Sequence, residues 1–112
     1  MAISPGTYNI ILQRRADYSI DLQFKDNTGT AINLTGWTIY SQVWNKTRTT
    51  KYADFTIIYT NRLTGQISLT LTDTQTTTFP DECYYDVLLE NPSSIREYYL
   101  EGTIYVSEGY TA

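Results

Sequence analysis

The sequence contains no histidine and only one cysteine, Cys83. Without histidine it cannot form a Ser-His-Asp or Cys-His catalytic arrangement, and it lacks the commonest metal ligand of proteins. A single cysteine excludes an internal disulfide and a zinc site made of cysteines, and it suits assembly in a reducing cytosol. We therefore predict that the protein is not an enzyme and uses no cofactor or metal ion.

Long apolar runs and an excess of positive charge are also absent. No stretch of about 18 apolar residues is present, so we expect no membrane-spanning helix, and the first residues lack the pattern of a secretory signal. The net charge is −4, which argues against nucleic acid as the main partner. No nucleotide-binding, nucleophile-elbow or metalloprotease motif occurs, so we expect no small-molecule substrate.

Threonine and tyrosine are abundant instead, with 11 tyrosines among 112 residues. β-Branched and aromatic side chains favour strands, and this length fits one domain with one core. We predict an all-β domain over residues 1–112, in which residues 1–6 and 109–112 form terminal arms.

Alternation of apolar and polar residues places the strands, and it is clearest over residues 18–25. There Tyr18, Ile20, Leu22 and Phe24 point one way and the polar residues between them point the other, as in a strand with one buried face. We predict strands at residues 8–13, 18–25, 31–34, 37–45, 52–60, 66–72, 83–90 and 97–106, with one short helical turn within 74–79. Seven or eight strands at this spacing indicate a β-sandwich or a small barrel.

Aromatic side chains predicted to point outward are candidates for a protein interface. The doublet Tyr98-Tyr99 must leave one ring outside, and Tyr110 lies just beyond the last predicted strand. Tyrosine is enriched in interfaces. Trp44 has two interpretations that the sequence does not separate: a ring packed under the next loop, or an anchor for a protein or a sugar. Tyr98 itself is predicted to share an inward face with Leu100.

Charge is unevenly distributed along the chain. Residues 1–65 carry a net charge of +3 and residues 66–112 one of −7. The basic groups cluster at Arg14-Arg15 and at Lys46, Arg48 and Lys51, which suggests contacts with acidic surfaces of other copies or of other proteins. We predict protein-interface roles for Arg14, Arg15, Trp44, Lys46, Arg48, Tyr98, Tyr99 and Tyr110.

Two further features have ordinary structural interpretations that we favour. Asp26, Asn27 and Thr28 lie in a turn where they could bind a hard cation, but an Asx turn uses the same residues without metal. Asp86 is predicted to be an outward, solvated carboxylate on a strand.

Several segments, taken in order, resemble the immunoglobulin-like domains of phage tail and baseplate proteins. These include the N-terminal domain of siphophage upper baseplate proteins and small virion proteins of cyanophage-type myophages. The segments that carry the resemblance are Arg15-Ala-Asp17, residues 18–24, Asp26-Asn-Thr-Gly29, Ile32-Asn-Leu-Thr-Gly-Trp37, Thr64-Gly65 with the strand at 66–72, Tyr85-Asp-Val87, and Leu100-Glu-Gly102 to Val106.

The resemblance implies an immunoglobulin-like antiparallel β-sandwich of about seven to eight strands. It also implies a structural role in the virion, as a tail or baseplate component assembled in the host cytoplasm. The expected partners are other phage virion proteins and copies of the same chain in a symmetric assembly. Two alternatives remain open: a capsid or neck decoration protein of the same fold, and a carbohydrate-binding module that holds host surface glycans through Trp44 and exposed tyrosines.

Overall fold

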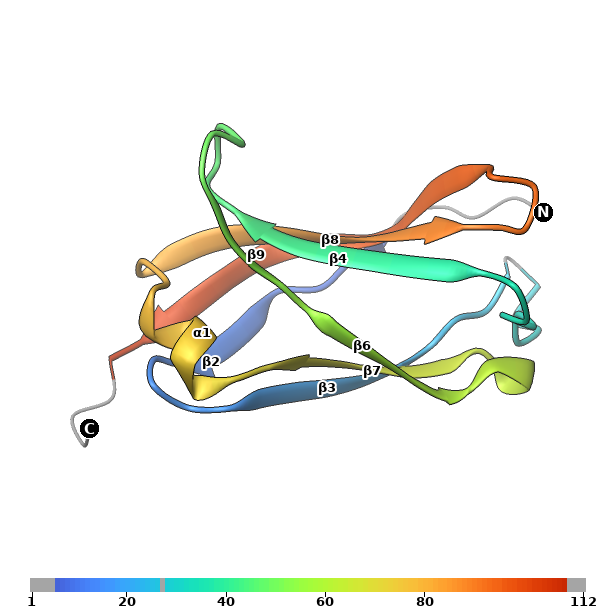
Figure 1. Cartoon of the computed structure of the whole chain (residues 1–112), viewed down its shortest axis with the longest axis horizontal. Coiled ribbons are helices and arrows are strands. Elements are labelled where there is room, and N and C mark those ends of the chain that lie inside the picture. Colours follow the sequence, from blue (N-terminus) through green and yellow to red (C-terminus); the bar gives the residue numbers. More distant parts are fainter. Residues whose placement is uncertain (1–5, 27, 109–112) are drawn as a thin grey trace.

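The computed structural model describes residues 6–26 and 28–108, which form two β-sheets packed face to face (Figure 1). In the larger sheet the strand order is β1-β9-β8-β4-β5, and β2 also pairs with β9. The smaller sheet has the order β3-β7-β6. The strands are β1 (Gly6–Thr7), β2 (Ile10–Gln13), β3 (Tyr18–Gln23), β4 (Thr38–Trp44), β5 (Lys51–Asp54), β6 (Thr56–Asn61), β7 (Gln66–Leu71), β8 (Glu82–Glu90) and β9 (Arg96–Ser107).

This strand order is that of an immunoglobulin-like sandwich, which confirms the predicted fold class. The smaller sheet corresponds to strands B, E and D of such folds, and β9-β8-β4-β5 corresponds to G, F, C and C′. β1 and β2 run parallel to β9, whereas the other described pairs are antiparallel. The first strands therefore extend the larger sheet, and β3 is left at an edge of the smaller one.

The core lies between the sheets and is made of the inward-facing alternate residues. On β7, for example, Ile67, Leu69 and Leu71 are at most 2% exposed. Burial of one such side chain contributes roughly 1.5–3 kcal/mol to stability. The cluster also includes Cys83, which is fully buried.

Two short helices connect strands, and neither has the length and apolar character needed to cross a membrane. The 3₁₀ helix η1 (Arg62–Thr64) lies between β6 and β7. The helix α1 (Asp73–Thr77) confirms the predicted helical turn. It begins with a capping box, in which the Thr72 hydroxyl accepts from the Gln75 N–H and the Gln75 side chain accepts from the Thr72 N–H.

The predicted strand at residues 52–60 is wrong, because the chain changes sheets at Phe55. β5 ends at Asp54 in the larger sheet, and β6 begins at Thr56 in the smaller one. Phe55 is buried, and its N–H donates to the Ser41 carbonyl at 2.9 Å. Because Ala53 and Phe55 both point to the core, the alternation continues through the break and does not reveal it.

Residues 31–34 form no strand, although a short strand was predicted there. Ile32 and Leu34 are buried as expected, but only Ala31 makes a bridge, to Lys25. The Leu34 N–H donates to the Arg62 carbonyl in η1 at 2.7 Å. Alternate burial is therefore present without the continuous ladder that defines a strand.

A β-bulge in β9 reverses the predicted orientations of Tyr98 and Tyr99. Leu100 pairs with Val87 and Tyr98 pairs with Leu88, so Tyr99 is an extra residue in the ladder. Tyr98 is consequently 53% exposed instead of facing inward with Leu100. The Tyr99 ring packs edge-on against Phe24, with centroids 4.5 Å apart.

The connection between β1 and β2 runs along the edge of β9 with which both strands pair, and approaches it at very short range. The Tyr8 N–H donates to the Glu101 carbonyl at 2.9 Å, and the Tyr85 hydroxyl donates to the Tyr8 carbonyl at 2.6 Å. A Cβ added at Gly102 would collide with that same carbonyl group of Tyr8. Gly102 is therefore required for the close approach of these segments.

Candidate binding site

The outer face of the larger sheet carries the residues that form the candidate site. The antiparallel register of β4, β8 and β9 aligns their outward side chains in rows across the sheet. One row combines acidic and amide groups, and two flanking rows are mostly aromatic. The rows are Tyr40-Leu88-Tyr98, Gln42-Asp86-Glu101 and Trp44-Tyr84-Thr103.

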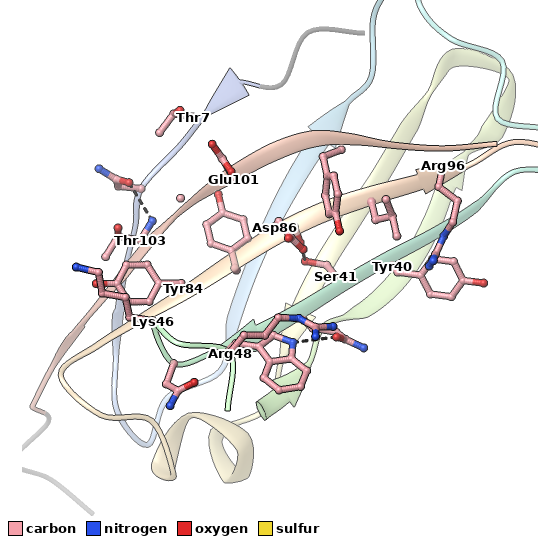
Figure 2. A pocket seen from close by; sticks show the side chains of 18 residues that line it. Thr7, Tyr40, Ser41, Lys46, Arg48, Tyr84, Asp86, Arg96, Glu101 and Thr103 are labelled. Atoms are coloured by element: carbon pink, nitrogen blue, oxygen red, sulfur yellow. Dashed lines mark hydrogen bonds between the residues drawn. The ribbon is translucent and has the colours of Figure 1, made fainter. Parts of the chain in front are cut away.

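These rows form the floor of an open groove of about 750 Å³ (Figure 2). The loop between β4 and β5 borders it with Lys46 and Arg48, and Arg96 borders it on β9. Side-chain hydrogen bonds shape that loop, because the Asn45 carboxamide oxygen accepts from the N–H groups of Thr49 and Thr50 at 2.8 and 3.1 Å. We call this surface the outer groove.

Guanidinium groups lie over two of the aromatic rings in the outer groove. The Arg48 guanidinium is 4.7 Å from the centre of the Trp44 ring, and that of Arg96 is 5.6 Å from the Tyr40 ring. The Trp44 indole N–H donates to the Gln42 side-chain oxygen at 2.9 Å. A loop residue therefore packs over the half-buried Trp44, as the first interpretation predicts, and the ring also lines the groove.

Asp86 lies in the middle of the groove floor and points outward as predicted, but it is half-buried rather than fully solvated. Burial raises the pKa of Asp86 above its ordinary value, and the negative charge of Glu101 beside it raises it further. Arg48 opposes these effects. The carboxylate is therefore held in a place that disfavours its charged form.

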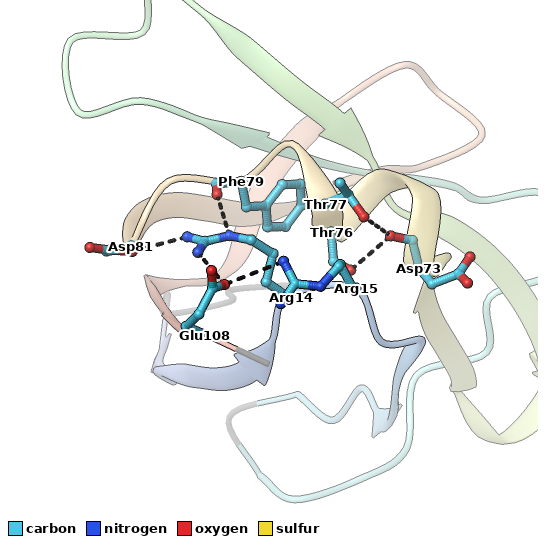
Figure 3. A network of polar contacts seen from close by, with 8 residues as sticks. All are labelled: Arg14, Arg15, Asp73, Thr76, Thr77, Phe79, Asp81 and Glu108. Atoms are coloured by element: carbon cyan, nitrogen blue, oxygen red, sulfur yellow. Dashed lines mark hydrogen bonds and ion pairs between the residues drawn. The ribbon is translucent and has the colours of Figure 1, made fainter. Parts of the chain in front are cut away.

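Arg14 and Arg15 lie elsewhere, in an ion-pair network at the end of β9 (Figure 3). Arg14 donates to Glu108 at 2.7 Å, to Asp81 at 2.9 Å and to the Phe79 carbonyl at 3.1 Å. Arg15 is 3.5 Å from the same Glu108 carboxylate. These predicted interface residues thus bind acidic groups of their own chain, which fixes the 14–17 turn against the loop before β8.

The remaining predicted interface residues are distributed differently. Lys46, Arg48, Trp44 and Tyr98 all line the outer groove. Tyr99 points away from it, packs on Phe24, and its hydroxyl accepts from the Lys25 N–H at 3.3 Å. Tyr110 lies outside the described residues.

Sequence reasoning missed several groove residues. Tyr40, Tyr84, Asp86, Arg96 and Glu101 occupy outward positions on the same three strands. Alternation correctly placed most of them outward. The pairing register that brings them side by side was not available from one sequence, and this register was the missing signal.

Cys83 and Asp26 have local structural roles. Burial, with Glu82 adding to it, raises the pKa of the Cys83 thiol to about 12, which keeps it protonated and unreactive at neutral pH. Asp26 accepts from the Thr28 N–H, the Thr28 hydroxyl and the Thr30 N–H, and these bonds lower its pKa. This arrangement confirms the Asx turn. No group of three or more acidic or cysteine side chains within residues 6–26 and 28–108 is arranged to hold a metal ion.

No model of a known protein family matches this chain, and no curated protein matches it either.

Proposed function

We propose that the chain is a phage virion structural protein, a tail or baseplate component that binds a neighbouring virion protein through the outer groove. The observation that carries the proposal is the composition of the groove, which is lined by Trp44 on β4, Tyr98 on β9 and Arg48 on the bordering loop. Tryptophan, tyrosine and arginine are the side chains that most often dominate the energy of protein interfaces. The assignment to a virion rests on the segments that resemble phage tail and baseplate domains.

The same geometry disfavours the carbohydrate-binding alternative. A sugar stacks on the open face of an aromatic ring, yet Arg48 lies over Trp44 and Arg96 approaches Tyr40. A glycan would have to displace these cations before it could stack. A protein partner can instead place carboxylates against the exposed edges of the same guanidinium groups.

Tyr98→Ala tests the groove as the binding surface. The partner candidates are the virion proteins encoded beside this chain's gene, purified and tested individually by calorimetry. We expect Tyr98→Ala to weaken binding of the cognate partner by about tenfold or more, because it removes an exposed aromatic anchor from the groove.

Tyr105→Ala is the matched control for this experiment. Tyr105 is also an exposed tyrosine of β9, at 45% compared with 53% for Tyr98, but it does not line the groove. Its replacement should change the affinity less than twofold. Equal losses for the two variants, or no loss for either, would contradict binding through the groove.

The place in the particle requires a separate measurement. Mass spectrometry of purified virions, followed by gold-labelled antibodies, should detect the chain at the tail. Label on the capsid or neck would instead favour the decoration protein, and absence from the particle would overturn the virion assignment.

A further inference from the structure

β3 is an edge strand with an open hydrogen-bonding side (Figure 1). Among the described strands it pairs only with β7. The Phe24 N–H donates to the Gly65 carbonyl, so in this antiparallel ladder the even-numbered residues of β3 direct their backbone groups toward β7. The backbone groups of Ser19, Asp21 and Gln23 therefore point away from the sheet.

One end of this open side is closed by a side chain of the same molecule, because the Lys25 N–H donates to the Tyr99 hydroxyl at 3.3 Å. Before Lys25, no other described strand pairs with the open side of β3, which leaves a segment the length of one short strand.

The apolar row of β3 is also incompletely covered. Tyr18, Ile20 and Leu22 face the core but are only half-buried. Their ladder partners on β7 are Leu71, Leu69 and Ile67, and these are at most 2% exposed. The sandwich thus leaves one side of its apolar interior open, along the same strand that has unpaired backbone groups.

The edges formed by β5 and β6 are interrupted or protected. β5 is short, its pairing with β4 is irregular at Val43/Trp44, and Lys51 and Asp54 form an ion pair along it at 3.1 Å. The pairing of β6 with β7 shifts register between Ile58 and Asn61. β3 has neither proline nor a register shift, and thus lacks most of the features that keep edge strands from pairing.

We propose that a second copy of this chain pairs its own β3 with this edge, antiparallel and around a two-fold axis at Ile20. The apolar side chains of both copies must stay on the core side of the joined sheet. Each even-numbered residue of β3 must therefore lie opposite an even-numbered residue of the other copy's β3. Among the registers with the greatest overlap, an axis at Asp21 would place two carboxylates directly opposite each other. An axis at Ile20 pairs Tyr18 with Leu22 and Ser19 with Asp21 of the other copy, so the strand is complementary to itself.

The resulting dimer has one continuous six-stranded sheet made from two copies of β3-β7-β6. It joins the half-buried apolar rows of the two β3 strands into one row. It also pairs the backbone groups of β3 that point away from β7 in each copy. The outer groove lies on the other sheet and is not used. The proposal therefore stands independently of the proposed virion function.

Analytical ultracentrifugation of the full chain tests the dimer. We expect concentration-dependent dimers for the wild-type chain and about tenfold weaker association for Ser19→Asp, because this change places like charges opposite each other twice in the interface. Thr60→Asp is the matched control, an exposed threonine on β6 at the far edge of the same sheet, and it should not alter association. A monomeric wild-type chain, or dissociation caused by Thr60→Asp instead, would overturn the proposal.

The register is tested by interchain disulfides. Mixing Ser19→Cys and Asp21→Cys chains under oxidation should give covalent dimers, because directly opposite residues lie within the range of a disulfide. Mixing Ser19→Cys with Thr60→Cys should give none. The register at Ile20 is wrong if Asp21→Cys alone crosslinks as efficiently as the mixture.

Discussion

At the scale of single residues, Asp86 occupies a position in the outer groove that lowers the stability of the isolated chain. It lies on the groove floor next to Glu101, and its burial and the neighbouring charge disfavour ionisation. A solvated position on the sheet would avoid this penalty. The arrangement is consistent with a surface shaped for a partner rather than for the stability of the isolated chain.

Asp86→Asn is therefore expected to stabilise the isolated chain at pH 7. The pKa of Asp86 is raised in the folded state above its ordinary value of 3.8. The contribution of Asp86 to stability is then fully present below that ordinary value and is lost as pH rises through the folded pKa. Urea unfolding should show a higher free energy of unfolding for Asp86→Asn at pH 7, and a difference that shrinks toward zero at pH 3.

Glu82→Gln provides the control, since Glu82 is an exposed carboxylate on the same strand. It should unfold close to wild type at both pH values. If Asp86→Asn is less stable than wild type at pH 7, the carboxylate has a stabilising partner and our interpretation of its environment fails.

At the residue scale, the sequence left open whether Trp44 packs under the next loop or faces outward, and in the structure it lines the outer groove with Arg48 beside it. Arg14 pairs with Asp81 and Glu108, which are distant in sequence but lie beside it in the fold. A single sequence gives no information about such distances, so it could not show that Arg14 binds acidic groups of its own chain.

At the scale of elements, the close contact of the chain between β1 and β2 with β9 determines how the N-terminal strands join the larger sheet. Tyr8 bonds to both β8 and β9 through the Tyr85 hydroxyl and the Glu101 carbonyl. Gly102 permits this contact because it has no side chain. The parallel pairing of the N-terminal strands therefore depends on one glycine.

Gly102→Ala should destabilise the fold by roughly 1–3 kcal/mol, because the new methyl group forces the backbone apart. Gly6→Ala is the control: a Cβ there would lie 3.6 Å from its nearest neighbour, a side-chain carbon of Leu100. Chemical unfolding should separate the two variants clearly. Equal stability of Gly102→Ala and Gly6→Ala would contradict a tight contact between Tyr8 and Gly102.

Elements were predicted well where alternation and turns agreed. The strand at 66–72 and the helical turn after it matched β7 and α1 closely. The break at Phe55 and the bulge at Tyr99 escaped prediction for one reason: each is defined by the neighbouring strand rather than by the local sequence. A pattern of period two locates inward positions but not sheet membership or ladder register.

At the scale of the whole molecule, the two sheets present different surfaces. The larger sheet offers the aromatic and charged outer groove, and the smaller sheet offers the open edge of β3. Because these surfaces belong to different sheets, one copy can pair through β3 while its groove contacts another protein. Such a division allows a single small domain to join a symmetric assembly.

The most direct test of the account is a cryo-electron microscopy reconstruction of the particle that contains the chain. We predict that Trp44, Arg48 and Tyr98 are covered by a neighbouring protein in the assembled particle. A map in which the outer groove faces solvent in every copy would contradict the central claim.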